Sequence, residues 1–174
     1  MTSIIPHVVS QHAEEAAFLW LLRANAVRAP HERLSTLARL DGRLEAHIDG
    51  LRIAGDAGWE IGVGELQHKG GGEVFVAAYL ALERGNVAEF RAVTDVVTEV
   101  PSTAGGLISA LAWVSLDTAT ARIGELLGSA DPVLRSVGIA ASTAHRQDPG
   151  VALTDGFTSA VPDLRQRAFA AVGR

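Results

Sequence analysis

The sequence predicts an all-helical protein in which short helix pairs stack as an α–α superhelix behind an N-terminal helical hairpin. Three observations lead to this fold class. Apolar residues recur at spacings of three and four almost throughout the 174 residues. Proline, glycine, asparagine and aspartate divide the second part of the chain into helices of about a dozen residues. A short motif near the end of the chain also occurs twice at a regular offset, which is typical of stacked helical repeats.

The first helix is expected over residues 8–28, and Pro30 ends it because the residue before a proline avoids the α-helical region. The second helix, from about residue 34 to 52, has the clearest pattern in the chain. Its apolar stripe consists of Leu34, Leu37, Leu40, Leu44, Ile48 and Leu51. The two helices should form an antiparallel hairpin.

A weaker helix is expected over residues 57–67, where three glycines interrupt the apolar pattern and lower the helix propensity. The run Lys69-Gly-Gly-Gly72 then predicts a flexible connector. A phosphate-binding loop is excluded because its lysine would follow the glycines and a strand would precede them. The hairpin and connecting helix therefore occupy residues 1–68 and the repeats occupy residues 73–174, together as one continuous unit.

The repeat part should contain seven helices, near residues 73–84, 86–99, 103–115, 117–128, 132–146, 149–159 and 162–173. Gly85 with Asn86, Asp117 as an N-cap, and prolines 132 and 162 in first helical turns supply the boundaries. The stretch 93–100 is rich in Val and Thr. Charged residues at four-residue spacing, Arg91, Asp95 and Glu99, nevertheless favour a helix there.

Two segments of the repeat part align with one constant offset. The aligned pairs are Pro132 with Pro162, Leu134 with Leu164, Arg135 with Arg165, Ala140 with Ala170 and Ala141 with Ala171. Pro101 lies nearly the same distance before Pro132 and begins a weaker copy. Each unit of such an array buries its apolar face only against its neighbours.

A proline followed by Leu-Arg and a helix of small residues resembles the first turn of HEAT repeats. The stretches from Ile5 through Trp20 and from His47 to Glu60 resemble a family of bacterial HEAT-repeat proteins that has no assigned activity. The resemblance implies an extended surface for protein partners. It leaves open a HEAT-fold enzyme, either a DNA-glycosylase-like protein or a relative of bilin lyases.

Composition limits the function classes. The net charge is −5 and no basic cluster occurs along the chain, so we expect no nucleic-acid partner. There is no cysteine, which excludes disulfides and thiolate metal sites. The start of the chain lacks the features of a signal peptide, and the longest uncharged stretch, residues 100–116, is too polar for a membrane span. We therefore expect a cytoplasmic protein without membrane association.

No group of residues predicts catalysis or a bound cofactor. His12 and Glu15 share a helix face, and His47 lies on the next helix, but a metal centre needs three or four converging ligands. Asp49 lies two residues after His47 and should point elsewhere. We interpret the two histidines as a polar edge of the hairpin. No serine lies in a nucleophile-elbow motif. The sequence therefore predicts neither catalytic residues nor metal ligands.

Three residues are candidates for an interaction surface: Trp59, Arg135 and Arg165. Trp59 follows a glycine-rich turn and fits either a clamp between hairpin and repeats or a binding hot spot. The two arginines recur at equivalent positions. They should either bond a loop carboxylate such as Asp131 or Asp163, or form a ladder on the concave face. The tryptophans at positions 20 and 113 are expected in the core.

The sequence thus predicts a non-catalytic scaffold or adaptor with a protein partner whose identity it does not specify. The last residues, 170–174, lie inside an apolar helix. We expect either a piece of a longer protein or a short form whose last helix is covered by another molecule. Self-association through that helix is a third interpretation.

Overall fold

The computed structural model describes residues 4–173. Expectations that depend on residues 1–3 and 174, at the two chain ends, lie outside the described residues. Within the described range the chain forms ten α-helices, two short 3-10 helices and no strand, so the all-helical prediction is confirmed. None of the helices in that range has the length and hydropathy needed to cross a bilayer.

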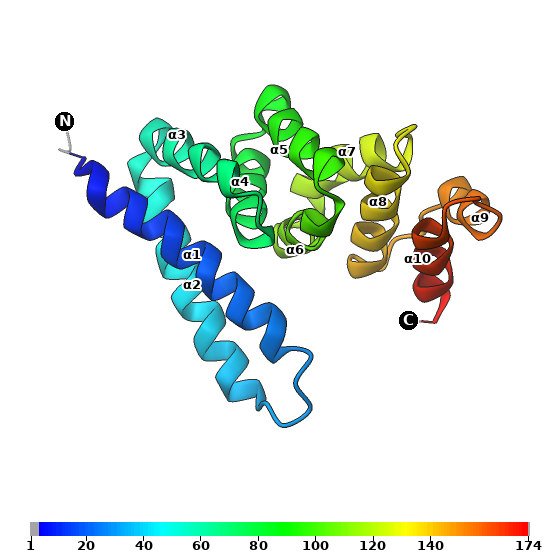
Figure 1. The fold of residues 1–174 in the computed structure, drawn as a ribbon, viewed down its shortest axis with the longest axis horizontal. Coiled ribbons are helices and arrows are strands. Elements are labelled where there is room, and N and C mark those ends of the chain that lie inside the picture. Colours follow the sequence, from blue (N-terminus) through cyan, green and yellow to red (C-terminus); the bar gives the residue numbers. More distant parts are fainter. Residues whose placement is uncertain (1–3, 174) are drawn as a thin grey trace.

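The hairpin consists of α1 (Pro6–Ala26) and α2 (Leu34–Ala54), which lie side by side and project away from the shorter helices (Figure 1). Only the second half of the predicted stripe on α2 is fully buried, at Leu44, Ile48 and Leu51. Leu34 is 84% exposed because the turn of the hairpin extends beyond the helices that cover α2 elsewhere.

The connecting helix is α3 (Asp56–Gly64), followed by the 3-10 helix η1 (Glu65–His68) and by α4 (Gly71–Arg84). The prediction of a flexible connector at residues 69–72 was wrong in its second half. Gly71 and Gly72 form the first turn of α4, and a Cβ atom at Gly72 would lie 2.3 Å from the carbonyl oxygen of Ala17. These glycines allow two helix backbones to pack closely.

The remaining elements follow the predicted order with shifted boundaries. They are α5 (Val87–Glu99), η2 (Pro101–Thr103), α6 (Ala104–Trp113), α7 (Leu116–Leu127), α8 (Pro132–Ala144), α9 (Val151–Phe157) and α10 (Pro162–Val172). Residues 93–99 are helical, as expected. The N-cap of α7 is Ser115, whose hydroxyl accepts from the Thr118 amide, and not the predicted Asp117.

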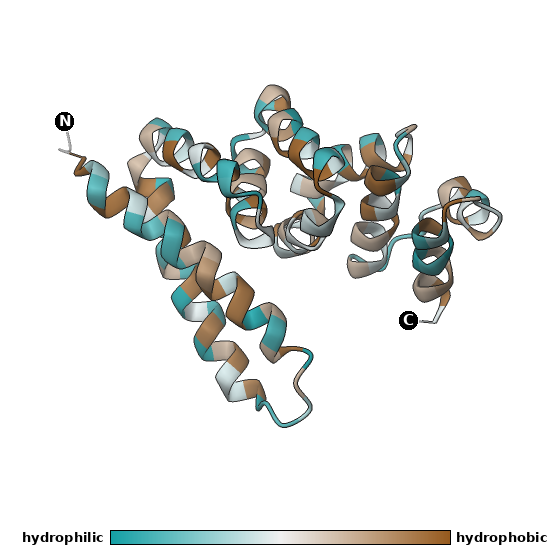
Figure 2. Cartoon of the chain, in the orientation of Figure 1, coloured by the Kyte–Doolittle hydropathy of each residue, from teal (hydrophilic) through white to brown (hydrophobic). Residues whose placement is uncertain are grey.

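The helices after the hairpin form two layers. In one layer α4 packs on α6, α6 on α8, and α8 on α10. In the other, α5, α7 and α9 cover this row from one side (Figure 1). Hydrophobic and hydrophilic residues alternate along the helices (Figure 2), as expected when one face of each helix packs against its neighbours.

The core is continuous from the hairpin to α8, and its central side chain is Phe75 on α4. Its ring stacks on Trp20 of α1 at a centroid distance of 6.0 Å and meets Trp113 of α6 edge-on at 5.5 Å. Trp20 is buried, as predicted. Trp113 is only half-buried, which corrects its assignment to the core, because its ring lies at the surface between α6 and the hairpin.

Candidate binding groove

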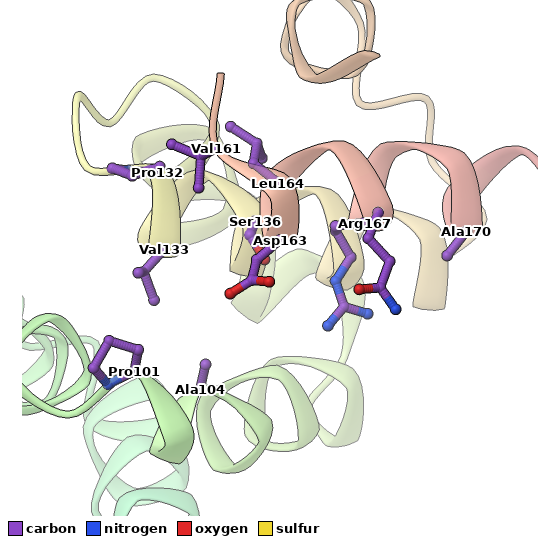
Figure 3. A pocket seen from close by; sticks show the side chains of 11 residues that line it. Pro101, Ala104, Pro132, Val133, Ser136, Val161, Asp163, Leu164, Arg167 and Ala170 are labelled. Atoms are coloured by element: carbon purple, nitrogen blue, oxygen red, sulfur yellow. The ribbon is translucent and has the colours of Figure 1, made fainter. Parts of the chain in front are cut away.

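The groove in Figure 3 crosses three successive helices of the first layer, α6, α8 and α10, and has a volume of about 300 Å³. Its lining residues are Pro101, Ala104, Pro132, Val133, Ser136, Val161, Asp163, Leu164, Gln166, Arg167 and Ala170. The prolines lie at the starts of the 3-10 helix η2 and of α8, where a missing amide proton costs nothing. The repeated helix starts therefore build one wall of the groove.

Polar groups in the groove come mainly from α10. Asp163 and Arg167 are four residues apart on that helix and point into the space between α10 and α6 (Figure 3). Ser136 of α8 adds a hydroxyl, while Ala104 and Val133 supply apolar surface. The groove thus combines small apolar patches with hydrogen-bonding and charged groups of both signs, which suits a peptide backbone and mixed side chains.

Two further hollows continue along the same layer. A small one of about 90 Å³ shares Arg167 and Ala170 with the groove and reaches Ile108 of α6. A shallow notch of about 380 Å³ lies between α6 and the hairpin, and its lining includes Ser109, the residue that follows Ile108 in the chain. We call the surface of these three hollows, between the hairpin and α10, the inner face.

The notch at the hairpin end of the inner face contains the exposed side of Trp113. The guanidinium of Arg23 lies 4.8 Å from the centre of this ring and forms an ion pair of 2.5 Å with Asp41. The indole Nε1 donates a hydrogen bond of 3.3 Å to Glu45 Oε2 on α2. Trp113 therefore joins the repeat helices to the hairpin, the clamp role that the sequence suggested for Trp59.

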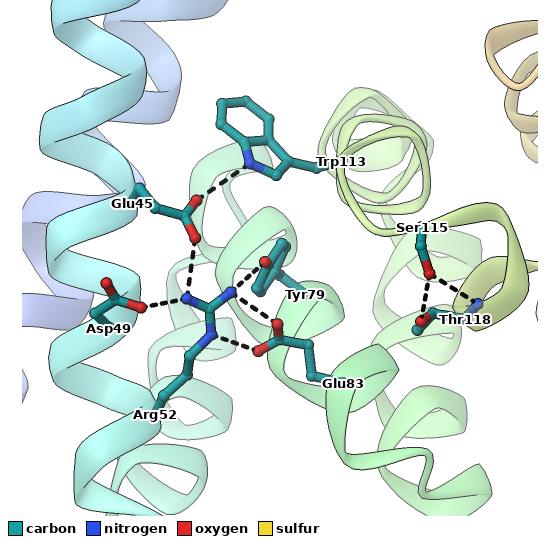
Figure 4. A network of polar contacts seen from close by, with 8 residues as sticks. All are labelled: Glu45, Asp49, Arg52, Tyr79, Glu83, Trp113, Ser115 and Thr118. Carbon is teal, nitrogen blue, oxygen red and sulfur yellow. Dashed lines mark hydrogen bonds and ion pairs between the residues drawn. The ribbon is translucent and has the colours of Figure 1, made fainter.

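A charged network beside this notch links α2 to α4 (Figure 4). The Arg52 guanidinium donates two hydrogen bonds of 2.7 Å to Glu83, one of 2.9 Å to Glu45, and one to Asp49. It also donates to the Tyr79 hydroxyl and lies over that ring at 5.2 Å. One cation thus holds three carboxylates from two helices.

The Arg52 guanidinium and the Tyr79 hydroxyl of this network keep their protons near neutral pH. The hydrogen bonds to Glu83, above all, raise the pKa of Arg52. Burial, followed by the negative charges of Glu83 and Glu45, raises the pKa of the Tyr79 hydroxyl. A phenol that stays protonated and a guanidinium that stays charged hold structure, and neither supplies a proton near neutral pH.

The three candidate interaction residues lie on three different helices, α3, α8 and α10. Trp59 is in the first turn of α3, half-buried against the core. Arg135 donates to the Ser129 carbonyl at 3.0 Å, and Arg165 donates to the Ser159 carbonyl. The expected partners, Asp131 and Asp163, do not receive these bonds.

The serines of these two bonds are also equivalent. In each unit the serine hydroxyl accepts from the backbone amide two residues later, at 3.1 Å in both cases. The same local structure therefore recurs in the two units, as the aligned sequences predict. The repeat arginines fix the loops that precede α8 and α10.

The hairpin histidines meet each other. His12 Nδ1 and His47 Nδ1 are 3.1 Å apart, with ring centroids 5.2 Å apart. Asp49 points to Arg52, as expected from its position. Among residues 4–173 no group of three or more His, Cys, Asp or Glu side chains has metal-binding geometry.

Comparisons with protein-family models, with curated proteins and with solved structures found no match. The site is therefore defined by the geometry of this chain. Sequence reasoning missed Arg52 and Arg167 because each is one of fourteen arginines with no local motif. The alignment of Ala140 with Ala170 did mark one side of the inner face, since both residues line the small hollow.

Proposed function

We propose that the chain is a non-catalytic protein-binding scaffold, an α–α superhelix of the HEAT-like kind, that holds a segment of a partner protein on the inner face. The observation that carries this proposal is the groove across α6, α8 and α10. A surface made by successive helices is extended, and an extended surface suits a polypeptide better than a compact small molecule.

The make-up of the inner face supports a protein partner in particular. Small side chains such as Ser109, Ala140 and Ala170 let a partner backbone approach closely, and Trp113 offers an aromatic anchor at the hairpin end. The lining of the groove includes one carboxylate and one guanidinium, Asp163 and Arg167. It therefore lacks the clustered positive charge that a nucleic-acid backbone attracts.

The recurring hydrogen bonds of Arg135 and Arg165 support the superhelical interpretation, because they give two units the same loop geometry. The layered packing of α4, α6, α8 and α10 supports it as well. Together with the sequence resemblance, these features support our proposal that the chain is a bacterial HEAT-repeat protein that acts in the cytoplasm.

The test is a quantitative pull-down with the tagged chain and with two arginine variants. Ala170→Arg places a long cation in the groove, whereas Ala121→Arg changes an equally exposed alanine on α7, in the other layer. We expect one near-stoichiometric protein partner that is lost with Ala170→Arg and kept with Ala121→Arg. The ratio of absorbance at 260 and 280 nm detects nucleic acid.

Two outcomes would overturn the proposal. Recovery of nucleic acid, or of a coloured small molecule without protein, would favour the glycosylase-like or bilin-related enzyme. A protein partner that both arginine variants retain equally would move the binding surface away from the inner face. Circular dichroism of both variants checks that each remains helical.

A further inference from the structure

A second groove lies between α1 and the start of α4. It has a volume of about 510 Å³, and residues of the 3-10 helix η1 also line it. Its apolar surface comes from Ala17, Phe18 and Leu21 of α1, opposite the backbone of Gly70–Gly72. We call it the acidic groove, for the carboxylates described below.

Two large apolar side chains in the acidic groove are open to solvent. Phe18 is 55% exposed and Leu21 is 49% exposed, although Ala17 and Leu19 beside them are buried. The two residues lie three apart on α1 and so share a helix face. Exposed apolar side chains that gather in a hollow, rather than singly, are typical of interaction sites.

Carboxylates surround this apolar surface. Glu14 lies one helical turn before Phe18, Glu65 comes from η1, and Glu73 comes from the first turn of α4. The lining includes one basic side chain, His68, whose Nε2 is 3.5 Å from Glu65. The neighbouring Lys69 is bonded to Glu99 of α5, so its charge is already balanced by a carboxylate outside the groove.

We propose that the acidic groove binds a basic segment of a partner protein, which inserts an apolar side chain beside Phe18 and Leu21 and sets Lys or Arg against Glu14, Glu65 and Glu73. Charge complementarity determines the choice of occupant. An acidic segment or a nucleic-acid backbone would meet three carboxylates at short range, and like charges at close contact cost affinity.

The volume of the groove fits this occupant. About 510 Å³ accommodates one or two large apolar side chains together with the stems of flanking lysines. The glycines at positions 70–72 carry no side chains, so the occupant can lie close to the α4 backbone. The inference deepens the proposed scaffold function, because it specifies the chemistry of a protein partner at a second surface.

The experiment measures fluorescence anisotropy of a labelled 14-residue peptide of leucine and lysine at helical spacing. A matched peptide with glutamate in place of lysine is the charge control. The protein variants are Glu14→Lys, in the groove, and Glu32→Lys, on the exposed turn of the hairpin, which change the net charge equally. A third variant, Phe18→Ser, removes the apolar contact.

We expect the lysine peptide to bind the wild-type chain at least tenfold more tightly than the glutamate peptide. Glu14→Lys should weaken binding by about fivefold to tenfold and Phe18→Ser by a similar factor, while Glu32→Lys should leave it within about twofold. The effect of Glu14→Lys should shrink at high salt and that of Phe18→Ser should persist.

Equal losses in Glu14→Lys and Glu32→Lys would overturn the proposal, because they would reflect net charge alone. Equal binding of both peptides would overturn it too. This result is separable from the test of the inner face. If Ala170→Arg removes the natural partner while Glu14→Lys leaves the lysine peptide bound, the scaffold function survives and the acidic groove does not.

Discussion

The hairpin joins α4 and α6 by different means from those that join α10 to α8. At the hairpin junction, glycine backbones touch, aromatic rings stack around Phe75, and Arg52 holds three carboxylates. At the C-terminal end Leu164 is buried, but Phe169 is 63% exposed, although its repeat equivalent Ile139 is fully buried. The first junction therefore combines several kinds of contact, while the second leaves a large apolar side chain exposed.

This difference indicates that the two junctions differ in rigidity. A junction with several independent attachments keeps the hairpin at a fixed angle to the repeat helices, and both proposed grooves depend on that angle or lie beside it. A repeated unit with few attachments opens more readily, because stability varies along stacked helices.

The largest effect is expected from Gly72→Ala. Its Cβ would lie 2.3 Å from the Ala17 carbonyl oxygen and 2.9 Å from Ala17 Cα, so α1 must move away from α4. We expect the free energy of unfolding to fall by about 2–4 kcal/mol, measured by urea denaturation. In the C-terminal unit, the Cβ of Gly156→Ala would lie 2.9 Å from the Ala168 Cβ, 3.6 Å from Ile139 Cδ1 and 3.8 Å from the Leu164 carbonyl oxygen, so its closest contact is a side-chain atom and the change should cost about 1 kcal/mol.

Gly124→Ala on α7 is the control, since a Cβ there meets nothing within 4 Å. It should stabilise the chain by about 0.5–1 kcal/mol, because alanine has the better helix propensity. A loss at Gly156 as large as that at Gly72 would contradict the comparison, since the two ends would then be equally tight.

The close approach at Gly72 also marks the limit of what the sequence could predict. Helical period predicted each α-helix found among residues 4–173, although one predicted cap was wrong, and the alignment of Arg135 with Arg165 predicted equivalent positions correctly. The triglycine run looks the same whether it serves as a loop or as a packing surface. Only the position of α1, which lies far earlier in the chain, decides between them.

The sequence did not predict the surface position of Trp113, in the notch of the inner face, for a related reason. Trp113 has apolar neighbours in sequence and was assigned to the core. Its ring instead contacts Arg23 and Glu45 of the hairpin and is half-buried. The partners of a side chain across a helix junction depend on the angle between helices. Apolar periodicity predicts which face of a helix is buried but not that angle.

Arg52→Met tests the charged network and should have the second-largest effect. The variant leaves Glu45, Asp49 and Glu83 near one another without their shared cation. We expect a loss of about 1–2 kcal/mol in the free energy of unfolding at low salt, partly recovered at high salt as repulsion is screened. Arg39→Met, on an exposed position of the same helix, is the charge-matched control and should change little. A loss that does not depend on salt would assign the effect to lost packing.

Arg135→Ala and Arg165→Ala compare the two repeat units directly. Each removes a guanidinium bond to a serine carbonyl, and each should cost about 0.5–1.5 kcal/mol. Hydrogen exchange separates them. Arg165→Ala should accelerate exchange only in α9 and α10, whereas Arg135→Ala should affect α7, α8 and the helices beyond. Uniform acceleration by Arg165→Ala would show that the last unit does not open by itself.

The smallest effect concerns pH and is confined to the hairpin. His12 Nδ1 and His47 Nδ1 are 3.1 Å apart, so a proton on one nitrogen can form a hydrogen bond to the other. Two positively charged imidazole rings at this distance would repel each other. Burial, then the charge of His12, lowers the pKa of His47 below its usual 6.5, and Glu15 opposes this while Arg43 adds to it.

The unfolded chain therefore binds more protons than the folded chain just below pH 6.5, and stability must decrease as the solution is acidified. The contribution of His47 to stability is fully present above pH 6.5 and is lost as the pH falls through the lower pKa that His47 has in the folded state. Urea denaturation between about pH 5 and 7.5 should show this slope in the wild-type chain and a weaker slope in His47→Gln. His31→Gln, on the exposed turn, should retain the full slope. An unchanged slope in His47→Gln would assign the pH dependence to groups outside the histidine pair.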